Sequence, residues 1–223
     1  MVVLKYQKTE EGKFFSHLNL LRLWNRLVSI AGIEVKYTEG FNKTRKLYFS
    51  SPTRVGVDSL CEYIVIDTDE EAEDVEDKLE NILPCWLKIL NLCDVEKKFN
   101  IPALNSRAKY KITFDEYKNK REKVKEFFER KEIVVPVISH GELKYVDVKD
   151  RIFDVKAKDN GLEVVCGVGN ESVRIDEVVK LMLKELHLPE FEWNIRKEVL
   201  YLTNENGEVV EVDEHLSKIK IDD

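Results

Sequence analysis

Hydrophobic positions in the first hundred residues follow a strand–helix–strand–strand–helix–strand order. Residues 2–8 alternate apolar and polar side chains, as a half-buried strand does. Ser16 is a good N-cap and Gly32 a good stop for the helix between them. Its apolar residues at helical spacing are Leu20, Trp24, Leu27, Val28 and Ala31. The remaining predicted elements are strands at 34–37, 47–51 and 62–68, a helix over 69–84 and a strand at 86–96.

The same order recurs after a connector at 100–106. A charged amphipathic helix at 115–130 carries Tyr117, Val124, Phe127 and Phe128. A second helix begins at Asn170 or Ser172 and runs to Leu186. The strands expected around these helices are 108–114, the hairpins 132–139 with 143–148 and 151–158 with 162–168, and a closing hairpin of 198–203 with 208–212.

This order predicts an α+β protein of two tandem ferredoxin-like βαββαβ units. Each unit would have an antiparallel sheet with its helices on one face. We place the first domain at 1–100, including the basic segment defined below, and the second at 107–223, including one extra hairpin.

Composition favours a soluble cytoplasmic protein. The 223 residues are 43% hydrophobic, and no apolar run reaches the roughly 20 residues that span a bilayer. The first residues become charged too soon for a signal peptide. Cys61, Cys85, Cys93 and Cys166 form no closely spaced ligand pair, so we expect buried reduced cysteines, no metal and no cofactor.

Charge is segregated along the chain. Residues 13–54 hold eight lysines and arginines against two glutamates, a net charge of +6, whereas the whole chain carries −7. Such a segment favours an anionic partner, although a solvated basic face would have the same composition. Arg22 and Arg26 lie one helical turn apart, and Lys43, Arg45 and Lys46 lie in a polar loop. Together these cations could neutralise several RNA phosphates.

Aromatic side chains flank that loop. Tyr37, Phe41, Tyr48 and Phe49 could stack bases, although we expect at least two of the four to be core residues. Tyr48 and Phe49 are adjacent in a strand and should face opposite ways.

Three further residues have candidate roles in the segment. His17 and Glu39 could orient a ligand, and Gly40 fits a tight turn with positive φ or a close backbone approach to a ligand. His17 is the weak catalytic candidate, because no nucleophile, base and orienting group stand together near it in the sequence. The helix-capping role remains open for it.

The N-terminal motifs resemble the bacterial radical-SAM-linked protein family, a domain of unknown function. The resemblance is specific over residues 14–63. Its residues are Phe15-Ser16-His17-Leu18-Asn19-Leu20 with Arg22, then Tyr37, then Glu39-Gly40-Phe41-Asn42 with Lys46, and then Pro52, Val55-Gly56, Ser59 and Glu62-Tyr63. Lys43-Thr44-Arg45 stands where the family tends to have Pro-His-Pro, which makes the loop more basic.

The resemblance implies a partner more than a reaction. Family members occur fused to, or encoded beside, a radical SAM protein, and they tend to neighbour RNA-processing genes. This chain has no C-x-x-x-C-x-x-C cluster motif of its own. Tandem ferredoxin-like units also resemble RNA endonucleases that cut CRISPR repeats, a likeness of fold alone.

Three functional hypotheses follow. The first is an accessory protein that binds structured RNA and works with a radical SAM partner. The second is a metal-independent RNA-processing or RNA-modifying enzyme that uses His17 with Tyr37 or a lysine. The third is a protein–protein interaction module, which would expose an apolar patch in place of a cationic one.

Overall fold

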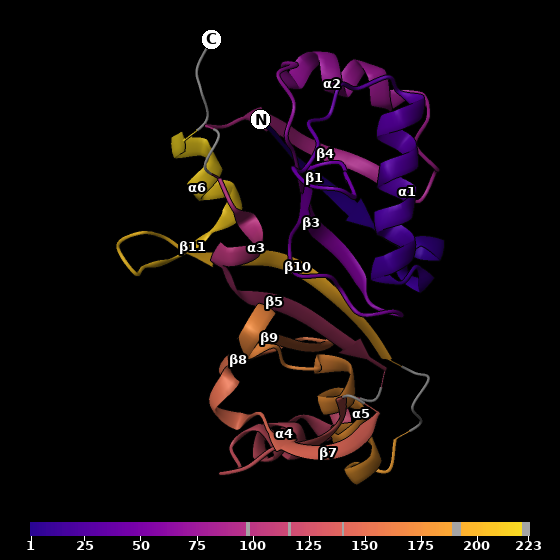
Figure 1. Ribbon diagram of the computed structural model, residues 1–223. Coiled ribbons are helices and arrows are strands. Elements are labelled where there is room, and N and C mark those ends of the chain that lie inside the picture. Colours follow the sequence, from indigo (N-terminus) through magenta and orange to yellow (C-terminus); the bar gives the residue numbers. More distant parts are fainter. Residues whose placement is uncertain (97–98, 116, 140, 189–192, 220–223) are drawn as a thin grey trace. The chain divides into compact units, whose positions relative to one another are not determined.

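The chain divides into two compact units in a computed structural model (Figure 1). The structure describes residues 1–96, 99–115, 117–139, 141–188 and 193–219. Unit 1 comprises residues 1–105 with 199–223, and unit 2 comprises residues 106–198. Residues 199–223, which the sequence placed in a second domain of 107–223, therefore group with unit 1.

Unit 1 begins with the predicted order of strands and helices. Its elements are β1 (Val2–Lys8), the 3-10 helix η1 (Glu10–Phe14), α1 (His17–Ile30), β2 (Leu47–Phe49), β3 (Asp58–Ile66), α2 (Ala72–Glu80), β4 (Leu87–Asp94) and the short α3 (Ile101–Leu104). The strand expected at 34–37 is reduced to two isolated bridges, Val35 to Thr68 and Tyr37 to Arg45.

One face of the unit 1 sheet carries α1 and α2. β1 pairs antiparallel with both β3 and β4, and β2 pairs with β3, so the strand order is β4-β1-β3-β2. Alternation turns Val2, Leu4 and Tyr6 to the same side as Ile64 and Ile66. These residues form one core with Trp24 and its helical neighbours, and with Val75 and Leu79 of α2.

The opposite face is covered by a helix that the sequence pattern did not predict. β11 (Val209–Glu211) leads into α6 (Val212–Ile219), which buries Val212 and Leu216. On this side of the sheet Asp213 accepts hydrogen bonds from Tyr63 Oη (2.8 Å) and Lys5 Nζ (2.5 Å). Figure 1 shows α6 on the side of β1 and β3 away from α1. The expectation of helices on one face is therefore wrong for unit 1.

Unit 2 repeats the strand order of unit 1. Its elements are β5 (Asn105–Phe114), α4 (Tyr117–Phe128), β6 (Val134–Ser139), β7 (Glu142–Asp147), η2 (Lys149–Arg151), β8 (Ile152–Lys158), β9 (Gly161–Gly167), η3 (Gly169–Glu171), α5 (Ile175–Glu185) and β10 (Trp193–Thr203). The order of its main strands is β10-β5-β9-β8, and β6 with β7 forms a separate two-stranded sheet. Residue 116, at the expected start of the helix 115–130, lies outside the described residues.

The strands do not form two separate sheets. The hydrogen-bonded path is β4-β1-β3-β10-β5-β9-β8, with β2 and β11 off the path, which makes nine strands in one sheet. β10 is long enough to contribute its first residues to unit 2 and residues 199–203 to unit 1. The α+β class and the mostly antiparallel pairing are confirmed, whereas separate sheets for two tandem units are not found.

Candidate nucleic-acid interface

An exposed basic stripe runs along α1. The buried side of this helix is apolar, and Ser16 caps its start by accepting from the Asn19 amide at 3.3 Å. Arg22 and Arg26 are exposed, and Ser29 continues the same stripe three residues later. The helix therefore presents both predicted arginines to solvent on one side.

The segment 36–46 is a closed loop that ends beside this stripe. Lys46 N donates to Lys36 O at 2.8 Å, and Thr38 N donates to Thr44 O at 2.9 Å. These bonds leave residues 39–43 as the tip, where Gly40 has φ of +117°, as the turn prediction requires. Glu39, Phe41 and Lys43 are all exposed at this tip.

Arg45 joins the loop to the helix. Its Nη2 donates a hydrogen bond to Ser29 Oγ at 3.2 Å, and its guanidinium carbon lies 5.7 Å from the centre of the Tyr37 ring. Because Ser29 follows Arg26 on the stripe, the three arginines come from two segments but share one side of unit 1. We call Arg22, Arg26, Arg45 and Tyr37 the arginine surface.

Lys46 does not belong with these free cations. Its Nζ lies 3.5 Å from Asp67 Oδ2, and Asp67 is also 3.9 Å from Lys36 Nζ. Lys36 is further hydrogen-bonded to Asp69, which raises the pKa of Lys36. Among the described residues, no carboxylate is ion-paired with Arg22, Arg26, Lys43 or Arg45. The predicted role of Lys46 as a phosphate ligand is therefore weakened.

The aromatic residues divide differently from the prediction. Phe49 packs against the core of unit 1, whereas Tyr37, Tyr48 and Phe41 are exposed, the last of them completely. The expectation of at least two core residues is therefore wrong. Tyr48 pairs with Val65, whose side chain faces away from α1, so Tyr48 lies on the opposite side of the sheet from the arginine surface.

His17 stands above a buried ionic cluster. Its ring contacts Phe49 edge-on at 5.9 Å between centroids. Burial lowers the pKa of His17; the charge of Glu62 opposes this shift and that of Lys8 adds to it. Glu62 and Lys8 are 3% and 0% exposed. Both meet at Thr53, whose hydroxyl donates to Glu62 and whose carbonyl accepts from Lys8 Nζ at 3.4 Å.

The sequence reasoning missed this cluster, although a signal for it was present. Lys8 lies in register with Val2, Leu4 and Tyr6, so strand alternation already turns it inward. Glu62 is likewise in phase with the buried Ile64 and Ile66. Burial raises the pKa of Tyr6, and the charge of the Glu62 carboxylate adds to this shift.

Residues 2–187 match a protein family described as "Uncharacterized protein conserved in bacteria (DUF2344)". The chain belongs to this family. A search of curated proteins finds no match. The resemblance is thereby confirmed for a bacterial family of unknown function, and the link to radical SAM proteins stays a prediction.

The DUF2344 match contains the arginine surface, the loop tip and the buried cluster. It also contains Gly56, which turns the chain before β3: its φ is +87°, and its N–H donates a hydrogen bond to Lys13 O at 2.8 Å. Among the described residues, no helix is both long and apolar enough to cross a membrane. The same residues hold no group of three or more histidine, cysteine or acidic side chains that could bind a metal ion.

Proposed function

We propose that this DUF2344 protein binds structured RNA and acts as an accessory to a radical SAM partner in RNA or ribosome-related metabolism. The observation that carries the proposal is the Arg45–Ser29 hydrogen bond, which gathers three arginines without carboxylate partners on one side of unit 1. Guanidinium groups bind phosphates through paired N–H donors, and these three arginines belong to an otherwise acidic chain.

The loop tip supplies the second part of an RNA site. Phe41 is fully exposed beside Lys43, and an unpaired base can stack on such a ring. Folded RNA offers both phosphates and unpaired loop bases, which suits this combination. Glu39 at the same tip would accept hydrogen bonds from base amino groups, and Gly40 lets the backbone turn beneath the base.

The architecture proposed for this function is a pair of ferredoxin-like units that share β10. Its support is the equivalent strand order in the two units, β4-β1-β3-β2 and β10-β5-β9-β8. In this comparison the hairpin of β6 and β7 is the extra element of unit 2.

RNA binding should depend strongly on salt and on the arginine surface. The wild type should bind a fluorescent stem-loop RNA more weakly as salt rises. The triple variant Arg22→Glu, Arg26→Glu, Arg45→Glu should make the log–log salt slope shallower by about 2 to 3. Fluorescence anisotropy measures both affinities. The matched control reverses three exposed lysines of unit 2: Lys118→Glu, Lys123→Glu, Lys131→Glu.

Equal losses of affinity in the two triple variants would contradict the interface, because net charge alone would then explain binding.

The enzymatic alternative is tested by the length and composition of the RNA recovered after incubation with the protein. His17 lies in the fields of Glu62 and Lys8, a setting that can serve acid–base chemistry. RNA shortened or altered by the wild type but left intact by His17→Ala would favour the enzyme over the accessory protein.

A protein partner would find its contact on the hairpin of unit 2. β6 pairs with β7 so that Ile138 lies opposite Leu143, and Pro136 lies opposite Tyr145. These residues share one face with Val134, and the four side chains other than Pro136 are exposed. Exposed apolar faces of this kind mark protein contacts. We assign this hairpin face to the radical SAM partner.

Charging the hairpin face should separate the partner from this protein. The double variant Ile138→Asp, Tyr145→Asp should lose co-purification with a co-expressed radical SAM protein encoded beside its gene, because each aspartate would stay unpaired in an apolar contact. The control, Leu90→Asp with Val209→Asp, changes two exposed apolar residues of unit 1 and should retain the partner. Retention by both variants would exclude the hairpin face, and RNA binding tests the rest of the proposal independently.

A further inference from the structure

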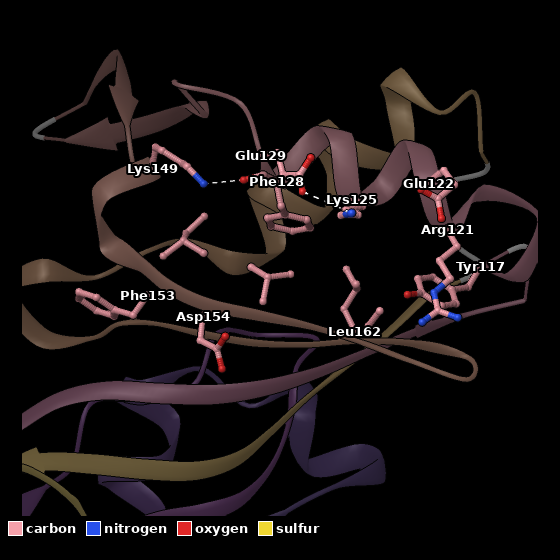
Figure 2. A pocket seen from close by; sticks show the side chains of 13 residues that line it. Tyr117, Arg121, Glu122, Lys125, Phe128, Glu129, Lys149, Phe153, Asp154 and Leu162 are labelled. Atoms are coloured by element: carbon pink, nitrogen blue, oxygen red, sulfur yellow. Dashed lines mark hydrogen bonds and ion pairs between the residues drawn. The ribbon is translucent and has the colours of Figure 1, made fainter.

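An open cavity of about 630 Å³ lies in unit 2, between α4 and the strands β8 and β9 (Figure 2). Pockets for small ligands usually have volumes of roughly 300–1,000 Å³. The residues that decide its chemistry are Tyr117, Arg121, Phe128, Ile152, Val155 and Leu162. Its lining residues belong to unit 2, whereas the arginine surface belongs to unit 1.

The spacing of side chains on α4 explains why the cavity exists. Val124, Phe127 and Phe128 are buried, but Arg121 and Lys125 occupy the helical positions above β8. Long polar side chains turn outward there and do not fill the space over an apolar floor. That floor consists of Ile152, Val155, Ala157 and Leu162, with Ala157 directly opposite Leu162 in the sheet.

One hydroxyl inside the cavity lacks an acceptor for its proton. Tyr117 is 1% exposed, and its hydroxyl, which lies beside Arg121, finds no acceptor for its proton among the described residues. Figure 2 shows the hydroxyl end of the ring turned into the cavity, beside the guanidinium of Arg121. Because buried hydroxyls are nearly always hydrogen-bonded, an O–H donor here is available to a ligand acceptor.

Arg121 supplies the charge at the same end. Among the described residues it has no ion pair, whereas two of the lining carboxylates do. Glu129 lies 3.7 Å from Lys125, and Asp154 lies 2.9 Å from Lys156. Glu122 also lines the cavity but forms no ion pair with Arg121, so the guanidinium is free for an anionic ligand.

We propose that this cavity binds an amphipathic organic anion, a carboxylate attached to an apolar body. The carboxylate would accept hydrogen bonds from Arg121 and from the Tyr117 hydroxyl. The apolar body would cover Phe128, Ile152, Val155 and Leu162. The site goes beyond RNA binding and does not depend on it.

The fluorescent dye 1-anilinonaphthalene-8-sulfonate, an aromatic body with one anionic group, is the probe. Arg121→Gln should weaken its affinity about tenfold or more, because a charge-assisted hydrogen bond is lost. Lys123→Gln removes the same charge from α4 outside the cavity and should change affinity less than about twofold. Tyr117→Phe keeps the ring and should weaken binding about fivefold.

Two further measurements tie the dye to this cavity. Ala157→Trp, which fills the space, should abolish the dye signal while circular dichroism shows a folded chain. Decanoate below its micellar concentration should displace the dye, and decanol should not, because only decanoate carries the carboxylate. Unchanged dye affinity in Ala157→Trp, equal losses in Arg121→Gln and Lys123→Gln, or equal displacement by decanol would each overturn the proposal.

Discussion

Lys8→Met is expected to lower the free energy of unfolding by about 3–5 kcal/mol, the cost of leaving a buried charge without its counter-charge. Lys8 is fully buried, and Glu62 is 3% exposed. Thr53 links them, since its carbonyl accepts from Lys8 and its hydroxyl donates to Glu62. Methionine keeps most of the side-chain volume but removes the positive charge, so the Glu62 carboxylate would stay buried without that charge near it. Urea denaturation followed by circular dichroism measures the loss.

The double variant Lys8→Met, Glu62→Gln separates charge from packing. With both charges removed, no uncompensated ion is left, and much of the lost stability should return. Lys88→Met is the matched control, because Lys88 is exposed on β4. A single variant no more damaging than Lys88→Met, or a double variant with strictly additive losses, would show that the two charges are not coupled.

Strand alternation and helical spacing recovered most elements of the fold. α1 and β4 lie within two residues of their predicted ranges, because their apolar residues pack against a single core, whereas β3 begins at Asp58, four residues before the strand predicted at 62–68. α6 was missed for a related reason. Its helical turn follows directly on β11, and its buried residues, Val212 and Leu216, are too few to stand out against a hairpin pattern. Its role follows only from its contact with the second face of the sheet, where Asp213 accepts a hydrogen bond from Tyr63.

The candidate site was predictable in its charge but not in its partners. The sequence shows that Arg22, Arg26 and Arg45 lie in a basic segment, and helical spacing places the first two together. It does not show that Asp67, twenty-one residues after Lys46, returns beside that lysine. Long-range pairing of this kind depends on strand register, which also put Tyr48 on the far side of the sheet.

The cavity of unit 2 was beyond the reach of periodicity for a different reason. The sequence identified α4 as a charged helix with Tyr117, Val124, Phe127 and Phe128 turned inward. Whether Arg121 covers the sheet or leaves a space depends on how closely α4 approaches β8. That distance follows from side-chain packing and leaves no mark in the hydrophobic pattern.

Trp24→Ala is expected to destabilise unit 1 by about 3–5 kcal/mol, through lost burial and the cavity that remains. Trp24 is completely buried on α1, and its ring meets Tyr6 edge-on with 5.0 Å between centroids. It packs in the core that joins α1 to β1 and β3, so no neighbouring side chain can swing in from solvent to fill the space.

Trp24→Phe tests whether shape or the indole N–H matters. The indole Nε1 forms no hydrogen bond of normal geometry among the described residues and only partly offsets the effect of burial, which raises the pKa of Tyr6, so phenylalanine should keep most of the stability. Leu23→Ala, at a half-buried position of the same helix, should cost clearly less than Trp24→Ala. Denaturant midpoints by circular dichroism compare the three variants. Equal midpoints for Leu23→Ala and Trp24→Ala would mean that α1 does not pack on β1 through Trp24, and the stripe of Arg22 and Arg26 would then no longer be assured of facing solvent.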